Sequence, residues 1–171
     1  MHESEPEIKQ LGHFLSNFNK ESDRGAALVA ASMLDERLHE ILINFFVDKL
    51  ASEILLSGFN APLGTFSARA SAAHALGLLQ ESEFKEITLI RKIRNEFGHG
   101  WQSVSFESGR VAELCSQLPW LGPKELESES GPRARFNAAI AILLTDLLWR
   151  GRLALKERRV LKTWPNKSRI A

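Results

Sequence analysis

Apolar side chains recur every three to four residues along most of the chain, the spacing that places them on one face of an α-helix. In the first such segment, Ile8, Leu11, Leu15 and Phe18 form one apolar stripe. No segment shows the sustained alternation, rich in β-branched and aromatic residues, that predicts a strand. The chain is therefore predicted to be all-α. We expect helices over residues 7–18, 23–56, 67–79, 82–97, 107–118 and 133–160.

Residues at the ends of these segments predict where the helices begin and end. Ser22 or Asp23 is the expected N-cap of the second helix, whose first half is small or apolar nearly all round and should lie in the middle of a bundle. Glycines and a proline in residues 57–64 predict a loop. Ser82 is the expected N-cap of the fourth helix, and Gly98 its end. The pattern favours a single-domain helical bundle of about five to seven helices.

Length and composition agree with one globular domain, since the chain has 171 residues, of which 44% are hydrophobic and 25% charged. Its one cysteine, Cys115, excludes an intramolecular disulfide and favours a reducing compartment. The first ten residues lack the basic start and apolar run of a signal peptide, and no later segment has the ~18 apolar residues of a membrane span. We expect a cytoplasmic protein that does not bind membranes.

The net charge of +1 conceals a division of charge along the chain. Residues 150–171 carry eight lysines and arginines against Glu157 alone, a net charge of +7, which leaves −6 for residues 1–149. We therefore predict a helical core over 1–149, and a basic helix end and tail over 150–171. A basic end of this kind attracts phosphate. The predicted contacts to DNA or RNA are Arg150, Arg152, Lys156, Arg158, Arg159 and Lys162.

The end of the fourth predicted helix gathers Arg94, Asn95 and His99, a set that suits phosphate chemistry. On a continuous helix, residues five apart lie ~140° apart around the axis, so Arg94 and His99 would not share a face. A helix end at Gly98 would let the chain turn back and bring His99 beside the last turn. Arginine then holds a phosphate oxygen, histidine transfers a proton, and asparagine orients either one. These groups suffice for metal-free cleavage of RNA.

The same residues also fit an ordinary helix end. The helix macrodipole favours a cation near the C-terminus, Gly98 is a common terminating residue, and His99 can donate to a free carbonyl. Arg94 would then pair with a buried carboxylate such as Asp23 or Asp35. An open cleft lined by Arg94 and His99 favours phosphate chemistry, whereas a buried pair favours packing.

Three blocks of the sequence carry a resemblance to known proteins: residues 22–38 (SDRGAALVAASMLDERL), 61–69 (APLGTFSAR) and 89–99 (LIRKIRNEFGH). They resemble bacterial proteins of the mannitol operon repressor family. The resemblance covers about residues 8–121 and is thin in the basic C-terminal part. It implies a small all-helical cytoplasmic protein, described as a transcriptional regulator, with no recognised helix-turn-helix.

A second resemblance rests on the Arg94-Asn95-x-x-x-His99 spacing, which is similar to the R-x(4–6)-H signature of the HEPN superfamily of helical ribonucleases and toxin-like proteins. This resemblance implies a dimer in which the arginine and histidine of two subunits face each other and cut RNA without a metal. Arg94 would hold the phosphate, His99 would transfer the proton, and Asn95 would support them.

A further polar set lies on the predicted second and third helices and is expected to form an ion-pair network that fixes how these helices and the fourth pack. It consists of Asp23, Arg24, Asp35, Arg37 and Arg69.

The sequence predicts no metal site and no cofactor. His13, His39 and His74 lie on different predicted helices without the spacing of metal ligands. Cys115 falls on an apolar stripe, where a buried, unreactive thiol is expected. There is no Gly-rich phosphate loop and no nucleophile elbow.

The leading prediction is a regulatory protein of the mannitol-repressor type, acting as a homodimer through a protein partner or through nucleic acid at the basic C-terminus. The alternative is a metal-independent ribonuclease centred on Arg94, Asn95 and His99. A third interpretation is a non-catalytic bundle that regulates by protein contact alone.

Overall fold

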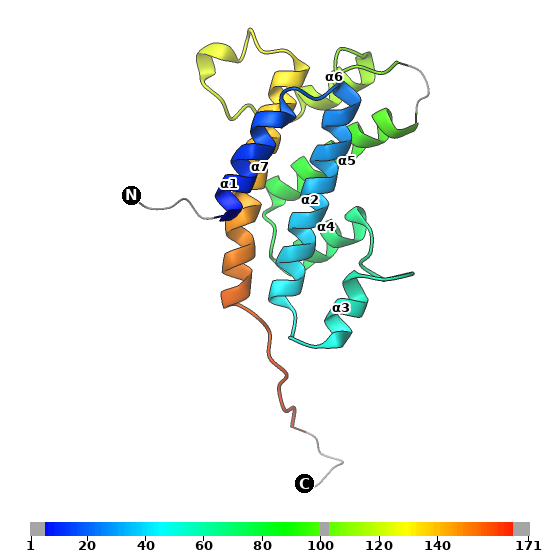
Figure 1. Ribbon diagram of the computed structural model, residues 1–171, viewed down its shortest axis with the longest axis vertical. Helices are drawn as coiled ribbons and strands as arrows, with labels where there is room; N and C mark the ends of the chain where they lie inside the picture. The colour runs from blue at the N-terminus through cyan, green and yellow to red at the C-terminus, as the bar shows by residue number, and fades with distance from the viewer. Residues whose placement is uncertain (1–5, 100–102, 166–171) are drawn as a thin grey trace.

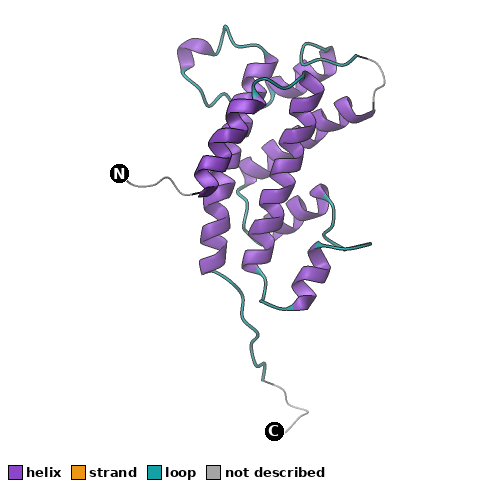
Figure 2. Ribbon diagram, in the orientation of Figure 1, coloured by secondary structure: helices purple, strands orange, loops and turns teal. Residues whose placement is uncertain are grey.

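The computed structural model describes residues 6–99 and 103–165. These residues form a helical bundle in which no strand occurs (Figure 2), so the prediction of an all-α, single-domain bundle is confirmed. None of the helices in the described part of the chain is long and apolar enough to cross a membrane. The helices are α1 (Pro6–Phe18), α2 (Asp23–Phe45), α3 (Leu50–Leu56), α4 (Phe66–Ala75), α5 (Glu81–His99), α6 (Gly109–Ser116), the short 3₁₀ helix η1 (Lys124–Leu126) and α7 (Pro132–Lys156).

Helix α2 lies at the centre of the bundle and packs against α7, α5, α4 and α3 (Figure 1). In its first half, Ala26, Ala27, Ala30 and Leu34 are all buried in the core. Small side chains allow neighbouring helices to approach closely, because the distance between helix axes depends on the residues at the contact. The predicted central position of this segment is confirmed.

An aromatic group closes the end of the core where α5 leads towards α6. The Phe97 and Phe106 rings lie 5.1 Å apart, and Phe106 lies 4.9 Å from Phe136 on α7. Arg133 covers this group, with its guanidinium 5.1 Å from the centre of the Phe106 ring and 2.9 Å from the Asp23 carboxylate. The start of α2 is thereby joined to the start of α7.

The prediction of one helix over residues 23–56 is wrong, because α2 ends at Phe45 and α3 begins only at Leu50. The residues between them contain neither glycine nor proline, so periodicity gave no sign of the break. Contacts from the chain directly after α7 accompany the break. Arg159 N–H donates to the Phe45 carbonyl (2.7 Å) and Arg158 Nε to the Asn44 carbonyl (3.0 Å). These bonds satisfy carbonyls that a helix end leaves free.

Other helix boundaries differ from prediction by a few residues. Ser22 caps α2 as expected, by accepting the Gly25 N–H. Ser82 is not the cap of α5, which begins at Glu81, and instead the Glu83 carboxylate accepts the Gln80 N–H (2.7 Å). Helix α4 ends at Ala75, before Gly77, whose φ of +73° favours glycine. Helix α7 ends at Lys156 rather than near residue 160.

Candidate functional site

Helix α5 presents two arginines beside its buried face. Ile87, Ile90, Ile93 and Phe97 form the stripe that faces the core. Arg91 and Arg94, one turn apart, lie next to this stripe; Arg91 is half-buried and Arg94 exposed. The 3.6-residue period alone places them together on one side of the helix.

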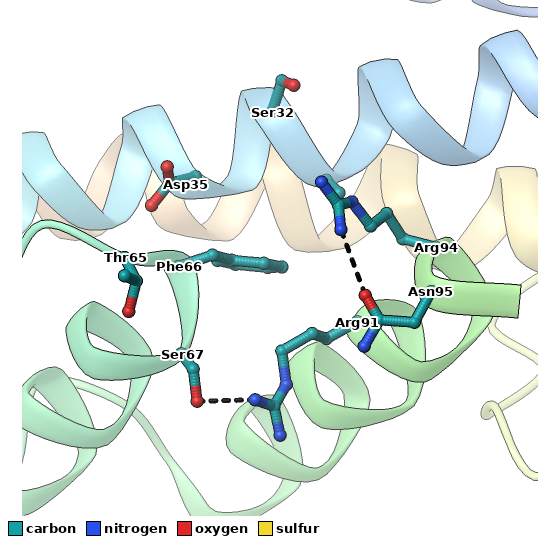
Figure 3. A pocket seen from close by; sticks show the side chains of 9 residues that line it. Ser32, Asp35, Thr65, Phe66, Ser67, Arg91, Arg94 and Asn95 are labelled. Atoms are coloured by element: carbon teal, nitrogen blue, oxygen red, sulfur yellow. Dashed lines mark hydrogen bonds between the residues drawn. The ribbon is translucent and has the colours of Figure 1, made fainter. Parts of the chain in front are cut away.

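These arginines line a cavity of about 320 Å³ between α2, α4 and α5. Figure 3 shows that their side chains extend from α5 towards the start of α4 and towards α2, with the Phe66 ring reaching into the space between. The lining is mostly polar. It consists of Ala31, Ser32 and Asp35 from α2, Thr65, Phe66 and Ser67 from the start of α4, and Arg91, Arg94 and Asn95 from α5.

Neutral groups are the partners of both arginines in the part of the chain that the structure describes. Arg91 Nη1 donates to Ser67 Oγ (2.6 Å), and Arg94 Nη1 donates to Asn95 Oδ1 (3.1 Å). The carboxylate on the cavity wall, Asp35, forms an ion pair with Arg69 (2.8 Å) instead. The cavity therefore carries a net positive charge beside a carboxylate that is already neutralised.

The expected helix end at Gly98 is wrong, since α5 continues through Gly98 to His99. Gly98 is not among the glycines with positive φ, the backbone conformation that would let the chain turn back. Arg94 and His99 thus stand five residues apart on one helix, ~140° apart around its axis. His99 is exposed and does not line the cavity. Within one chain, the arginine and histidine are not brought together.

The expectation that Arg94 pairs with a buried carboxylate is also wrong. Asp23 accepts from Arg133 and from the Phe106 N–H (2.9 Å), and Asp35 pairs with Arg69. Both carboxylates are thus engaged by other groups, and Arg94 stays exposed at the cavity. A cleft formed by two chains, which the HEPN resemblance implies, stays a prediction.

The predicted polar set on the second and third helices divides into separate contacts. Arg69 joins Asp35 and donates to the Leu63 and Leu56 carbonyls, so it ties the loop before α4 to α2. Arg37 instead contacts Glu40 on its own helix (2.6 Å). Asp23 belongs to the contact with α7 described above, and Arg24 is exposed near the start of α2.

Several residues of the predicted nucleic-acid contact bind other parts of the bundle. Arg150 forms an ion pair with Glu83 (2.9 Å), Arg152 pairs with Glu7, and Arg158 pairs with Asp48 (3.2 Å). The Arg159 guanidinium lies 4.8 Å from the centre of the Phe45 ring. The other two residues of the set, Lys156 and Lys162, are exposed.

The remaining candidate groups do not converge on a site. His13, His39 and His74 lie on α1, α2 and α4, and in the described ranges no three His, Cys, Asp or Glu side chains are placed to share a metal ion. Burial, followed by the charge of Arg69, lowers the pKa of His39. Cys115 is buried, and this burial raises its pKa to about 12, so the thiol stays protonated and unreactive.

Comparison with known proteins gives one informative match. No family model and no curated protein sequence matches the chain. The fold is shared with a solved structure. A chain in the X-ray structure of the MtlR-HPr complex from Escherichia coli superimposes with a TM-score of 0.59 at 20% sequence identity. The match covers 82% of this chain and 97% of that chain. At this identity the likeness shows the fold alone.

Sequence reasoning identified Arg94 and Asn95 but missed Arg91, Thr65 and Ser67. The spacing of Arg91 and Arg94 placed them on one side of a helix, and this was an available signal. The start of α4 lies more than twenty residues away in the sequence, and periodicity within single helices says nothing about which helix starts meet.

Proposed function

We propose that this chain is a non-enzymatic regulatory protein that acts by binding a protein partner. The observation that carries the proposal is the shared fold, which extends over 82% of this chain and nearly all of a chain from the MtlR-HPr complex. That structure is a complex of two proteins. We infer that this chain likewise uses its helical bundle to bind a protein. The resemblance to mannitol operon repressors supports a role in regulation.

An exposed apolar surface on α3 and the turn after it supports contact with a protein. Its side chains are Leu50, Ile54, Leu55 and Phe59, which we call the α3 apolar surface. Leu50 is 68% exposed, Ile54 59% and Phe59 97%. Grouped exposed apolar side chains are characteristic of interaction sites, because burying them against a partner removes them from water. We propose that the partner contacts this surface.

The contacts of the basic C-terminus favour a protein partner over DNA. Arg150, Arg152 and Arg158 each contact a carboxylate of the bundle. An arginine whose charge is balanced inside the protein releases fewer counterions on meeting phosphate, and so contributes less to binding nucleic acid.

Titration calorimetry with the HPr protein of the same organism tests the proposal. We expect saturable binding by the full chain, and we expect Phe59→Ala and Ile54→Ala each to weaken it about tenfold. Leu126→Ala is the matched control, because Leu126 is an apolar side chain that is 50% exposed on η1. Figure 1 shows this yellow segment at the end of the molecule away from α3. Equal weakening by all three variants would contradict the assignment of the surface.

Two nucleic-acid assays give results that would contradict the proposal. In the first, the chain does not bind HPr but binds promoter DNA in a salt-sensitive way, and removing the residues after Arg159 abolishes this DNA binding. This truncation leaves intact the contacts of Arg150, Arg158 and Arg159 with the bundle. The second is cleavage of RNA in EDTA that disappears in His99→Ala, which would establish the ribonuclease alternative. The homodimer stays a prediction, for which sedimentation equilibrium is the direct measurement.

A further inference from the structure

We propose that the cavity between α2, α4 and α5 binds the phosphate group of a small solute, with Arg91 and Arg94 as its charged partners. This proposal is separate from the contact with a protein partner, because the cavity and the α3 apolar surface share no residues.

Charge is the first argument. Elsewhere in the described chain, half-buried arginines such as Arg69, Arg133 and Arg150 contact a carboxylate at 2.8–2.9 Å. No carboxylate lies within ion-pair distance of Arg91 or Arg94 in the described residues, where their hydrogen bonds go to neutral oxygens. Like charges one turn apart on a helix repel each other. A bound anion between the two guanidinium groups would relieve this repulsion.

Hydrogen-bonding capacity is the second argument. A guanidinium has five N–H donors, and each of these arginines uses one of them in its hydrogen bond to a neutral side chain. The remaining donors suit phosphate, which accepts several hydrogen bonds at once. Ser32, Thr65 and Ser67, which carry hydroxyl groups, are also among the residues that line the cavity.

The start of α4 adds to the positive potential. Thr65 caps this ten-residue helix by accepting the Ala68 N–H (3.2 Å), and Thr65, Phe66 and Ser67 all line the cavity. Backbone N–H groups at a helix start favour negative charge. Here the first residues of α4 line the same cavity as two arginines that come from a different helix.

Size and lining favour a small solute over a nucleic-acid strand. A volume of about 320 Å³ lies at the lower end of ligand pockets, which leaves room for a phosphate and a short polar group. A strand needs a row of cations along its backbone, whereas two arginines face this cavity. Asp35 on the wall would repel an anion, but its pairing with Arg69 offsets that charge.

Titration calorimetry at low ionic strength, with inorganic phosphate, glycerol 3-phosphate and glycerol as probes, tests the proposal. We expect saturable binding at one site per chain for at least one of the two phosphates, and none for glycerol. Tighter binding of glycerol 3-phosphate identifies an ester as the ligand, and tighter binding of inorganic phosphate identifies the free ion. The absence of saturable binding for both phosphates would overturn the proposal.

Charge variants on α5 distinguish a specific binding site from general electrostatic attraction of phosphate to the protein. Arg94→Gln and Arg91→Gln should each weaken phosphate binding about tenfold, the effect of losing a charge-assisted hydrogen bond. Lys92→Gln removes the same charge from an exposed neighbour that does not line the cavity, and it should leave binding unchanged. Equal weakening by Lys92→Gln and Arg94→Gln would overturn the proposal. If Arg91→Gln does not fold, Arg94→Gln still provides the test, because the exposed Arg94 side chain bonds only its neighbour Asn95 among the described residues.

Discussion

Glu86 is a residue whose surroundings oppose its charge. It lies half-buried on α5, in a depression that Glu83 and Asp146 also line. Burial, followed by the charges of Glu83 and Asp146, raises the pKa of Glu86 above its ordinary value. The folded state therefore binds the proton more tightly than the unfolded state does. Ionised Glu86 opposes folding at neutral pH, and protonation removes this cost.

Replacing Glu86 by glutamine should stabilise the protein at neutral pH. The difference from the parent should shrink as the pH falls through the raised pKa of Glu86 and should vanish below the ordinary value of 4.5. Thermal unfolding of both proteins between neutral and acidic pH is the measurement. Glu96→Gln is the control, because Glu96 is exposed on the same helix. A stability gain for Glu86→Gln that is the same at every pH would show that charge is not its cause.

At the scale of elements, the continuity of α5 decides which side chains can meet. Gly98 lies inside this helix without positive φ, and a Cβ built there would lie 3.9 Å from Arg94 Nη1, an ordinary contact. The helix thus keeps Arg94 at the cavity and carries His99 to a different side. A left-handed glycine at this position would have produced the turn that the ribonuclease interpretation requires within one chain.

Gly98→Ala should therefore raise the free energy of unfolding by up to about 1 kcal/mol, because alanine loses less backbone entropy in a helix. Urea-induced unfolding measures the change. The comparison variant is Gly77→Ala, where φ is +73° and alanine should destabilise. Loss of stability in both variants would mean that α5 ends at Gly98.

At the scale of the whole molecule, the Arg150–Glu83 ion pair joins α7 to the start of α5. Arg150 donates to both Glu83 carboxylate oxygens (3.1 and 2.9 Å) and to the Leu78 carbonyl (2.6 Å). The Glu83 side chain is only 9% exposed and that of Arg150 21%. One basic residue of the C-terminal set thereby holds together the loop before α5, the start of α5 and the last helix.

Arg150→Ala should lower the free energy of unfolding by about 3 kcal/mol, because it leaves a buried carboxylate without its charged partner. The matched variant is Arg110→Ala, which breaks an exposed ion pair with Glu113 and should cost less than about 1 kcal/mol. Chemical denaturation of the two variants gives the comparison. Similar small losses would show that Arg150 is available for other contacts, including nucleic acid.

The sequence by itself determined the all-α class, the approximate course of most helices and the central position of α2. These follow from helical periodicity, caps and small residues, which act within a few neighbouring residues. Only the tertiary structure decided the break after Phe45 and the cavity. In the first, bonds from Arg158 and Arg159 reach the end of a helix more than a hundred residues earlier. In the second, α4 brings Thr65 and Ser67 to the arginines of α5. Such convergence depends on how whole helices pack, which no local pattern of residues specifies.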